Sequence, residues 1–123
     1  MSIKSYKDLL VWQKSMKLTY DIYKLCERLP KDEKYNLISQ IKRASISIPS
    51  NIAEGSKRSS RSDFRQFCLI ALGSAAEVET QLLIIRQLYP GVEISQSLDE
   101  IVDIQKMLQS LTKKLHSSEY KAK

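Results

Sequence analysis

The chain has 123 residues, a length that suits one domain around a single hydrophobic core. Hydrophobic residues make up 42% of it, and its three glycines and three prolines are too few for the frequent turns of an all-β sandwich or barrel. The net charge of +6 is compatible with nucleic acid, an anionic membrane or an acidic protein as partner. We therefore predict a single all-α domain over residues 1–123.

Several kinds of site are not expected. Apolar runs such as Leu9 to Trp12 are too short to span a bilayer, and no signal peptide is recognised, so we expect a cytoplasmic protein without membrane contact. Cys26 and Cys68 lie far apart in apolar surroundings and are predicted to be buried thiols rather than a disulfide. With His116 as the one histidine and no glycine-rich phosphate loop, we expect no metal, no cofactor and no catalytic residue.

The first predicted helix runs from about residue 6 to residue 28. Ser5 and Asp8 form an imperfect capping box at its start, and the residue before Pro30 resists helical geometry at its end. Two apolar stripes follow helical spacing along it: Val11, Leu18, Ile22, Leu25 and Leu29 in one, and Leu9, Trp12, Met16, Tyr23 and Cys26 in the other.

The second predicted helix spans about residues 32–55. Asp32 and Glu33 suit the positive start of a helix. Pro49 lies inside the helical pattern, and because Ile48 would be a poor N-cap for a new helix, we predict one helix kinked at Pro49. Gly55 is predicted to end it in left-handed geometry. The seam of this helix is Ile38, Ile41, Ser45, Ile48 and Ile52.

Two more helices complete the pattern. The third is predicted over about residues 62–88, with Ser62 as N-cap and with Gly73 and Ser74 small enough for another backbone to approach closely. The fourth spans about residues 97–116, with Ser97 and Glu100 as a capping box. Four such helices joined by short loops predict an up-down-up-down antiparallel bundle. The apolar stripes are wider than one seam requires, which fits either a thick core or a second apolar face used for self-association.

Positive charge is concentrated between the second and third helices. Arginine in a serine-rich loop suits phosphate, because its fork is bidentate and serine adds neutral donors. The alternative is a solvated loop with exposed ion pairs of little energetic value. Residues 66–112 by contrast carry two Lys/Arg and six Asp/Glu. The cluster consists of Lys57, Arg58, Arg61 and Arg65, and a weaker one of Lys113, Lys114, Lys121 and Lys123.

A polar stripe lies beside the isoleucine seam, and a second one lies on the third helix. We predict that the two stripes form hydrogen bonds across the helix interface, with Arg43 paired to Glu77 or Glu79. An enzymatic alternative would use Glu54 and Glu77 as a carboxylate pair, but no nucleophile, histidine or metal ligand supports it. The stripes are Gln40, Ala44, Ser47, Asn51, Glu54 and Arg58, and Ser74, Glu77 and Gln81.

Two stretches, QIKRASISIPSNIAEGSKR (residues 40–58) and FCLIALGSAAEVETQLLI (residues 67–84), resemble the four-helix bundle proteins named after the intervening sequences of bacterial 23S ribosomal RNA. The stretches YKDLLVWQKSMKL (residues 6–18) and LPKDEKYNL (residues 29–37) fit the same family, so the resemblance covers about residues 5–115. The matching positions serve a structural or a binding role; they are Gln40, Arg43, Ser47, Pro49, Asn51, Glu54, Gly55, Gly73, Ser74 and Glu77.

The resemblance implies similarity to the accessory protein of diversity-generating retroelements, which forms a homopentamer and binds nucleic acid and a reverse transcriptase. A homopentamer of this chain would carry +30 and would repeat the basic loop five times. We therefore expect a non-enzymatic oligomer that binds the backbone phosphates of structured RNA or DNA. The alternative is a protein–protein scaffold or an accessory subunit for a nucleic-acid enzyme such as a reverse transcriptase. The expected nucleic-acid-binding residues are Lys57, Arg58, Arg61, Arg65 and Arg43.

Overall fold

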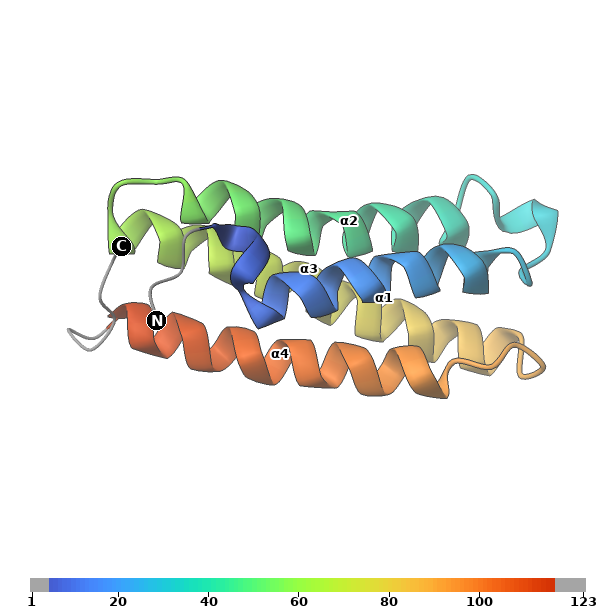
Figure 1. The fold of residues 1–123 in the computed structure, drawn as a ribbon. Coiled ribbons are helices and arrows are strands. Elements are labelled where there is room, and N and C mark those ends of the chain that lie inside the picture. Colours follow the sequence, from blue (N-terminus) through green and yellow to red (C-terminus); the bar gives the residue numbers. More distant parts are fainter. Residues whose placement is uncertain (1–4, 117–123) are drawn as a thin grey trace.

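The computed structural model describes residues 5–116 of the chain. Within them, α1 (Leu10–Cys26), α2 (Leu37–Ser56), α3 (Arg61–Leu88) and α4 (Ser95–His116) lie side by side as an antiparallel bundle (Figure 1). Two short 3-10 turns, η1 (Tyr6–Asp8) and η2 (Lys31–Glu33), precede α1 and α2. Each helix packs on the next one along the chain and α4 packs back on α1, so α1 and α3 are diagonal. The predicted all-α four-helix bundle is confirmed.

The core is built from the apolar seams of all four helices. Leu18, Ile41, Leu82 and Ile104, one from each helix, are fully buried, as the helical spacing of their seams requires. Cys26 and Cys68 are buried free thiols, as predicted. Burial raises the pKa of Cys26 to about 11 and that of Cys68 to about 12, because an apolar setting disfavours the thiolate.

Helix α2 runs through Pro49 as one continuous helix, as predicted, and a bend at this residue stays a prediction. A proline has no N–H to donate to the carbonyl four residues before it, which here is that of Ser45. The hydroxyl of Thr19 in α1 lies 3.2 Å from this carbonyl oxygen and 2.9 Å from that of Ser15 in its own helix, so its single proton is shared between two acceptors. Both Thr19 and Ser45 are buried, so the neighbouring helix offers the Ser45 carbonyl a shared donor in place of the N–H that the proline lacks.

The first two helices begin later than predicted. Ser5 caps η1 rather than α1, accepting the main-chain N–H of Lys7, and the extended residue Leu9 separates this turn from the first helix. Asp32 and Glu33 form η2, and α2 begins only at residue 37. In both places the predicted capping or acidic residues lie at a 3-10 turn, η1 or η2, which ends before the α-helix begins.

The last two helices begin earlier than predicted. The N-cap of α3 is Ser60, not Ser62, because the Ser60 hydroxyl accepts the main-chain N–H of Asp63 at 3.0 Å. Helix α4 begins at Ser95, whose main-chain N–H donates to a carboxylate oxygen of Glu93 at 2.7 Å. The proposed capping box at Ser97 is therefore wrong; Ser97 lies inside the helix and is buried.

Two glycines have roles that differ from those predicted. Gly55 lies inside α2, and no described residue has a positive φ, so the predicted left-handed stop is wrong. A Cβ at Gly55 would lie 2.6 Å from Cβ of Phe67 and 3.0 Å from Cδ1 of Phe64. The absence of a side chain at Gly55 therefore allows α3 to pack closely against α2. A Cβ at Gly73 would meet nothing within 4 Å, so the close approach predicted there is not made within this chain.

Candidate nucleic-acid interface

One end of the bundle gathers the turn between α2 and α3, the turn η1 and the end of α4 (Figure 1). Nε of Arg65 in α3 donates to the main-chain oxygen of Thr112 in α4 at 3.2 Å. Nζ of Lys57 lies 5.8 Å from the ring centroid of Tyr6 in η1. These contacts place the last turn of α4 beside the α2–α3 turn.

This arrangement joins two basic clusters that are far apart in the sequence. Lys113 and Lys114 directly follow Thr112, and cations in the last turn of a helix complement its dipole. Counted over residues 6–8, 54–65 and 112–116, this end carries seven Lys/Arg and three Asp/Glu. Lys121 and Lys123, the rest of the weaker predicted cluster, lie outside the described residues. We use the name basic end for the exposed cations Lys57, Arg58, Arg61, Lys113 and Lys114.

The predicted loop residues differ in how firmly they are held. Arg58 forms an ion pair with Glu54 at 2.9 Å and stacks 4.8 Å from the ring centroid of Phe67. Both carboxylate and guanidinium remain exposed, so the pair adds little to stability and can be exchanged for another anion. Arg61 is the exposed first residue of α3. Arg65 is half-buried, and its contact with α4 makes it a structural residue of this end.

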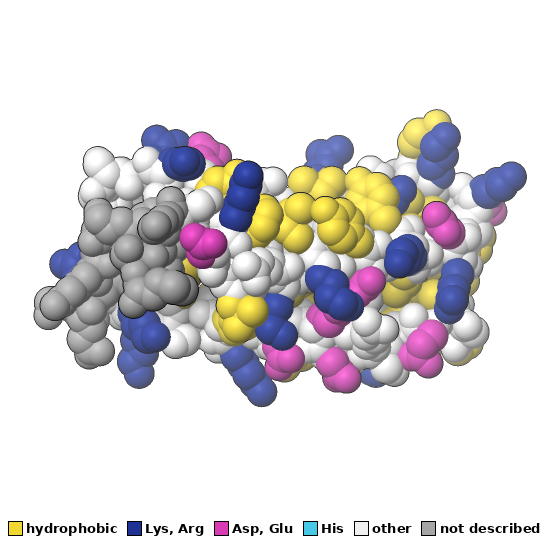
Figure 2. All heavy atoms as spheres, viewed as in Figure 1, with side chains coloured by type: hydrophobic (Ala, Val, Ile, Leu, Met, Phe, Trp, Pro, Cys, Tyr) yellow, Lys and Arg dark blue, Asp and Glu magenta, His cyan; other side chains and the backbone are white. Residues whose placement is uncertain are grey.

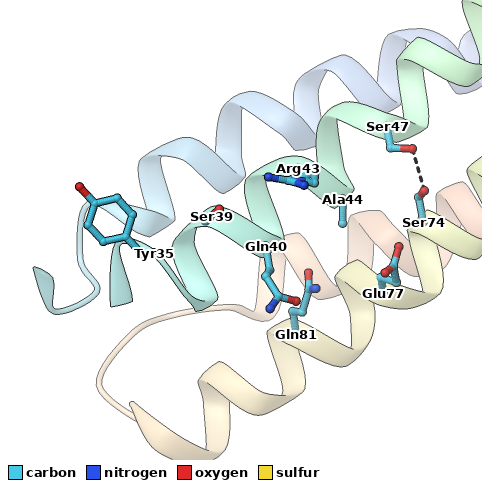
Figure 3. Close-up of a pocket in the computed structure, with 9 residues that line it drawn as sticks. All are labelled: Tyr35, Ser39, Gln40, Arg43, Ala44, Ser47, Ser74, Glu77 and Gln81. Atoms are coloured by element: carbon cyan, nitrogen blue, oxygen red, sulfur yellow. Dashed lines mark hydrogen bonds between the residues drawn. The ribbon is translucent and has the colours of Figure 1, made fainter. Parts of the chain in front are cut away.

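Arg43 does not join the basic end. It precedes Lys57 by fourteen residues on α2, about 21 Å along the helix axis at 1.5 Å per residue. It lines a groove of about 510 Å³ between α2 and α3 (Figure 3). The predicted ion pairs of Arg43 with Glu77 or Glu79 are not formed among the described residues, and Glu79 accepts a hydrogen bond from Gln105 instead. The groove is lined by Tyr35, Ser39, Gln40, Arg43, Ala44, Ser47, Ser74, Glu77 and Gln81.

One hydrogen bond across the α2–α3 interface, supported by a second within α2, confirms part of the predicted polar stripes. The hydroxyl of Ser74 donates to that of Ser47 at 2.8 Å (Figure 3), and Nδ2 of Asn51 donates to the same oxygen at 2.9 Å. Side chains of Gln40 and Gln81 point toward one another across the groove (Figure 3). Oε1 of Gln81 is nevertheless buried without a hydrogen-bond partner, so the groove holds an acceptor that lacks a donor.

The proposed carboxylate pair of Glu54 and Glu77 does not share one site. Glu54 lies beside Arg58 at the basic end, whereas Glu77 lines the groove with Arg43. Within residues 5–116, no three His, Cys, Asp or Glu side chains gather as potential metal ligands. Of the remaining family-motif positions, Pro49 is buried in α2 and Gly55 lies against Phe64 and Phe67 of α3, whereas Gly73 is exposed and has open space around it.

Sequence reasoning missed a charged cluster between α1 and α4. Nζ of Lys17 lies 2.7 Å from carboxylate oxygens of both Asp21 and Glu100. These hydrogen bonds raise the pKa of Lys17. Burial raises the pKa of Glu100, and the hydrogen bond from Lys17 offsets only part of this rise. Burial also favours a higher pKa for Asp21, but hydrogen bonds, the one from Lys17 first, hold the pKa of Asp21 below its usual value. The i, i+4 spacing could have revealed the Asp21 contact, whereas nothing local points to Glu100.

Helix α3 bears on the expectation of no membrane contact, which stays a prediction. By length and composition alone it is long and apolar enough to cross a bilayer, although core helices of soluble proteins pass the same test. Its unbroken apolar runs are short, because small and polar residues interrupt its aliphatic ones. Only 39% of its most apolar 18-residue window is buried, so much of this composition faces outward.

Comparisons with known proteins agree with the fold. The family model of the 23S rRNA-intervening sequence protein matches residues 7–110. The crystal structure of a protein of unknown function from the S23 ribosomal protein family of Bacteroides thetaiotaomicron VPI-5482 is 31% identical to the chain. The match covers 87% of this chain and 98% of that one, with a TM-score of 0.76. No curated protein matches the chain.

Proposed function

Because the chain belongs to the 23S rRNA-intervening sequence protein family, we propose that it is a non-enzymatic, oligomeric protein that binds RNA or DNA through backbone phosphates. The basic end is the observation that carries the proposal. It brings exposed cations from the α2–α3 turn and from the last turn of α4 to one surface. Clustered cations of this kind are the electrostatic footprint of phosphate binding.

The side chains of the basic end favour phosphate over base recognition. Guanidinium groups such as that of Arg58 and Arg61 bind a phosphate in bidentate fashion, while lysines act as point charges. Ser59 lies exposed in the same turn and adds a neutral donor. Backbone contacts carry no base information, so binding is proposed to be largely independent of sequence.

Self-association is the second part of the proposal. A homopentamer, as family resemblance suggests, would repeat the basic end five times on one particle. Each chain would contribute a modest patch, and simultaneous contact of several patches with one nucleic acid would raise the overall affinity.

Fluorescence anisotropy with a structured RNA and a DNA duplex at low salt tests the proposal. The basic-end variant is Lys57→Ala/Arg61→Ala/Lys113→Ala/Lys114→Ala, which keeps the Arg58–Glu54 ion pair and the hydrogen bond from Arg65 to Thr112. The matched control removes four exposed cations from the opposite end: Lys24→Ala/Arg28→Ala/Lys31→Ala/Lys34→Ala. We expect the basic-end variant to lose at least tenfold in affinity and the control to bind nearly as wild type. Equal losses in both variants would contradict the proposal.

The groove between α2 and α3 favours a second candidate function. Its exposed charged residues Arg43 and Glu77 line a polar groove, which is a feature of a protein-binding surface. The bundle would then be a scaffold or an accessory subunit for a nucleic-acid enzyme such as a reverse transcriptase. Absence of RNA and DNA binding at low salt, with one stoichiometric protein recovered after nuclease treatment, would favour this candidate.

A further inference from the structure

Exposed aromatic residues follow one side of α1. Tyr20 and Tyr23 are 57% and 42% exposed, and Trp12 is half-buried nearer the start of the helix. Steps of eight and then three residues separate Trp12, Tyr20 and Tyr23, which places them on one side of the helix, with Met16 between them. The core does not require exposed rings, so their gathering on one side marks an interaction site.

This side of α1 borders α2. Near the end of α1, Nζ of Lys42 in α2 lies 4.4 Å from the ring centroid of Tyr23. Near its start, the ring centroids of Trp12 and Tyr6 are 5.3 Å apart, and Tyr6 in turn contacts Lys57, which follows α2. Figure 2 shows the hydrophobic patch over α1 and α2, with basic side chains at its borders.

Cations frame this patch. On α2 its border runs in steps of three or four residues, with a lysine at each end and no acidic residue: Lys42, Ile46, Ser50, Ala53 and Lys57. On α1, Lys24 is exposed one turn after Tyr20, and the exposed Glu27 lies one turn after Tyr23, at the end far from Lys57. We use the name α1–α2 face for Trp12, Tyr20, Tyr23, Lys42, Ile46 and Lys57.

Aromatic rings framed by cations suit an unpaired strand of nucleic acid. Bases stack on exposed rings while phosphates pair with lysines, which is how proteins hold single strands without sequence preference. A duplex keeps its base faces stacked inside and offers only phosphates and groove edges to such a surface. The eleven residues from Trp12 to Tyr23 span about 16 Å along the helix axis, room for up to about five stacked nucleotides at about 3.4 Å each.

We infer that an unpaired segment of nucleic acid lies along the α1–α2 face, with bases stacked on Tyr20 and Tyr23 and with phosphates at Lys42 and Lys57. The inference rests on the proposed nucleic-acid binding and extends it from paired to unpaired segments. Lys57 belongs to both the basic end and the α1–α2 face, so the two surfaces are continuous. One structured RNA can therefore place a stem on the first surface and the adjoining loop on the second.

Fluorescence anisotropy with two probes tests the inference: an oligo-dT of about twelve nucleotides, which forms no duplex, and a DNA duplex of equal length. Tyr20→Ala/Tyr23→Ala removes both stacking rings and should lower the affinity for oligo-dT by about tenfold or more. Its affinity for the duplex should stay within about twofold of wild type, because the basic end is intact. Tyr20→Phe/Tyr23→Phe keeps the rings and should bind both probes as wild type. Circular dichroism would confirm that both variants fold.

Tyr35→Ala is the matched control. Tyr35 is 86% exposed, and Nζ of Lys34 lies 5.3 Å from its ring centroid, so it repeats the tyrosine–lysine contact away from the α1–α2 face, at the groove between α2 and α3. This variant should bind oligo-dT as wild type. Trp12, the one tryptophan of the chain, gives an independent readout, because a strand on the α1–α2 face should quench its fluorescence.

Three results would overturn the inference: unchanged oligo-dT affinity in Tyr20→Ala/Tyr23→Ala, an equal loss of duplex affinity, or saturation with oligo-dT that leaves the fluorescence of Trp12 unchanged. A change in particle mass by light scattering would also overturn it, because the two tyrosines would then hold copies of the chain together. Duplex binding by wild type alongside any of these results would leave the proposed function standing. Absence of binding to both probes at low salt would overturn the proposed function as well.

Discussion

Arg65 and Thr112 are joined by a hydrogen bond from Nε to the main-chain oxygen at 3.2 Å, across 47 residues of sequence. The contact fastens α3 to the end of α4. It thereby holds Lys113 and Lys114 beside the cations of the α2–α3 turn. The basic end depends on this tertiary contact, because neither cluster alone gathers as many cations.

Replacing Arg65 with methionine should therefore lower both stability and affinity. A lost hydrogen bond from a charged, half-buried donor costs about 1–2 kcal/mol in the free energy of unfolding. Arg86→Met is the matched control, because Arg86 is an exposed arginine on the same helix, and its cost should stay below about 0.5 kcal/mol. Urea unfolding measures the loss of stability in each of the two variants. Equal costs for the two variants would show that the contact with Thr112 is not stabilising.

The bond from Thr19 to the Ser45 carbonyl explains how α2 accommodates Pro49. Thr19→Val keeps the shape of the side chain but removes the donor that the carbonyls of Ser45 and Ser15 share, which should cost about 1–3 kcal/mol. In a Pro49→Ala background the restored main-chain N–H can bond the carbonyl, so the cost of Thr19→Val should fall by about half or more. A double-mutant cycle in urea measures this coupling. Strict additivity would contradict the account.

The two glycines of the bundle should respond in opposite ways to alanine. Gly55→Ala places a methyl group 2.6 Å from Cβ of Phe67, an atom near the backbone that cannot swing away, and should cost about 1–3 kcal/mol. Gly73→Ala meets open space inside a helix and should stabilise the isolated chain by about 0.5–1 kcal/mol. Thermal or urea unfolding at low protein concentration compares them. A Gly55→Ala protein as stable as wild type would show that α3 can shift at no cost.

The lysine between Asp21 and Glu100 should make stability depend on pH. In Lys17→Met the two carboxylates face each other without a cation, so the pKa of Glu100 should rise further. A raised pKa in the folded state costs stability at neutral pH, and protonation relieves this cost as the pH falls. The low pKa of Asp21 in wild type acts in the same direction, because its contribution is lost in acid. The deficit of the variant should therefore be largest at pH 7 and shrink toward pH 4.

Urea midpoints at pH 4, 5, 6 and 7 measure this deficit. Lys14→Met, an exposed lysine on the same helix, is the control and should show a small, pH-independent change. A constant deficit for Lys17→Met across this range would contradict the proposed role of the two carboxylates.

Much of the fold could be predicted from apolar spacing alone. The seams of all four helices repeat every three to four residues, and their members form the core. Helix starts were less predictable, because several hydroxyl and acidic side chains compete for each one. At α3, for example, both Ser60 and Ser62 are suitable caps by type, and only the path of the preceding turn selects Ser60.

The candidate site was predictable only where its residues are close in sequence. Lys57, Arg58 and Arg61 were identified from local composition, but their union with Lys113 and Lys114 depends on the packing of α3 against α4. The groove between α2 and α3 likewise exists only where the two helices pack. Arg43 shares its residue type with the loop arginines, but its position along α2 places it in the groove.

The salt dependence of nucleic-acid binding tests the central claim most directly. The logarithm of the association constant falls with the logarithm of salt concentration, with a slope of about 0.9 for each duplex phosphate neutralised. Removing Lys57, Arg61, Lys113 and Lys114 should reduce this slope by up to about 3.6 per chain that contacts the DNA. The variant lacking Lys24, Arg28, Lys31 and Lys34 should keep the wild-type slope. An unchanged slope in the basic-end variant would contradict the assignment of phosphate binding to this end.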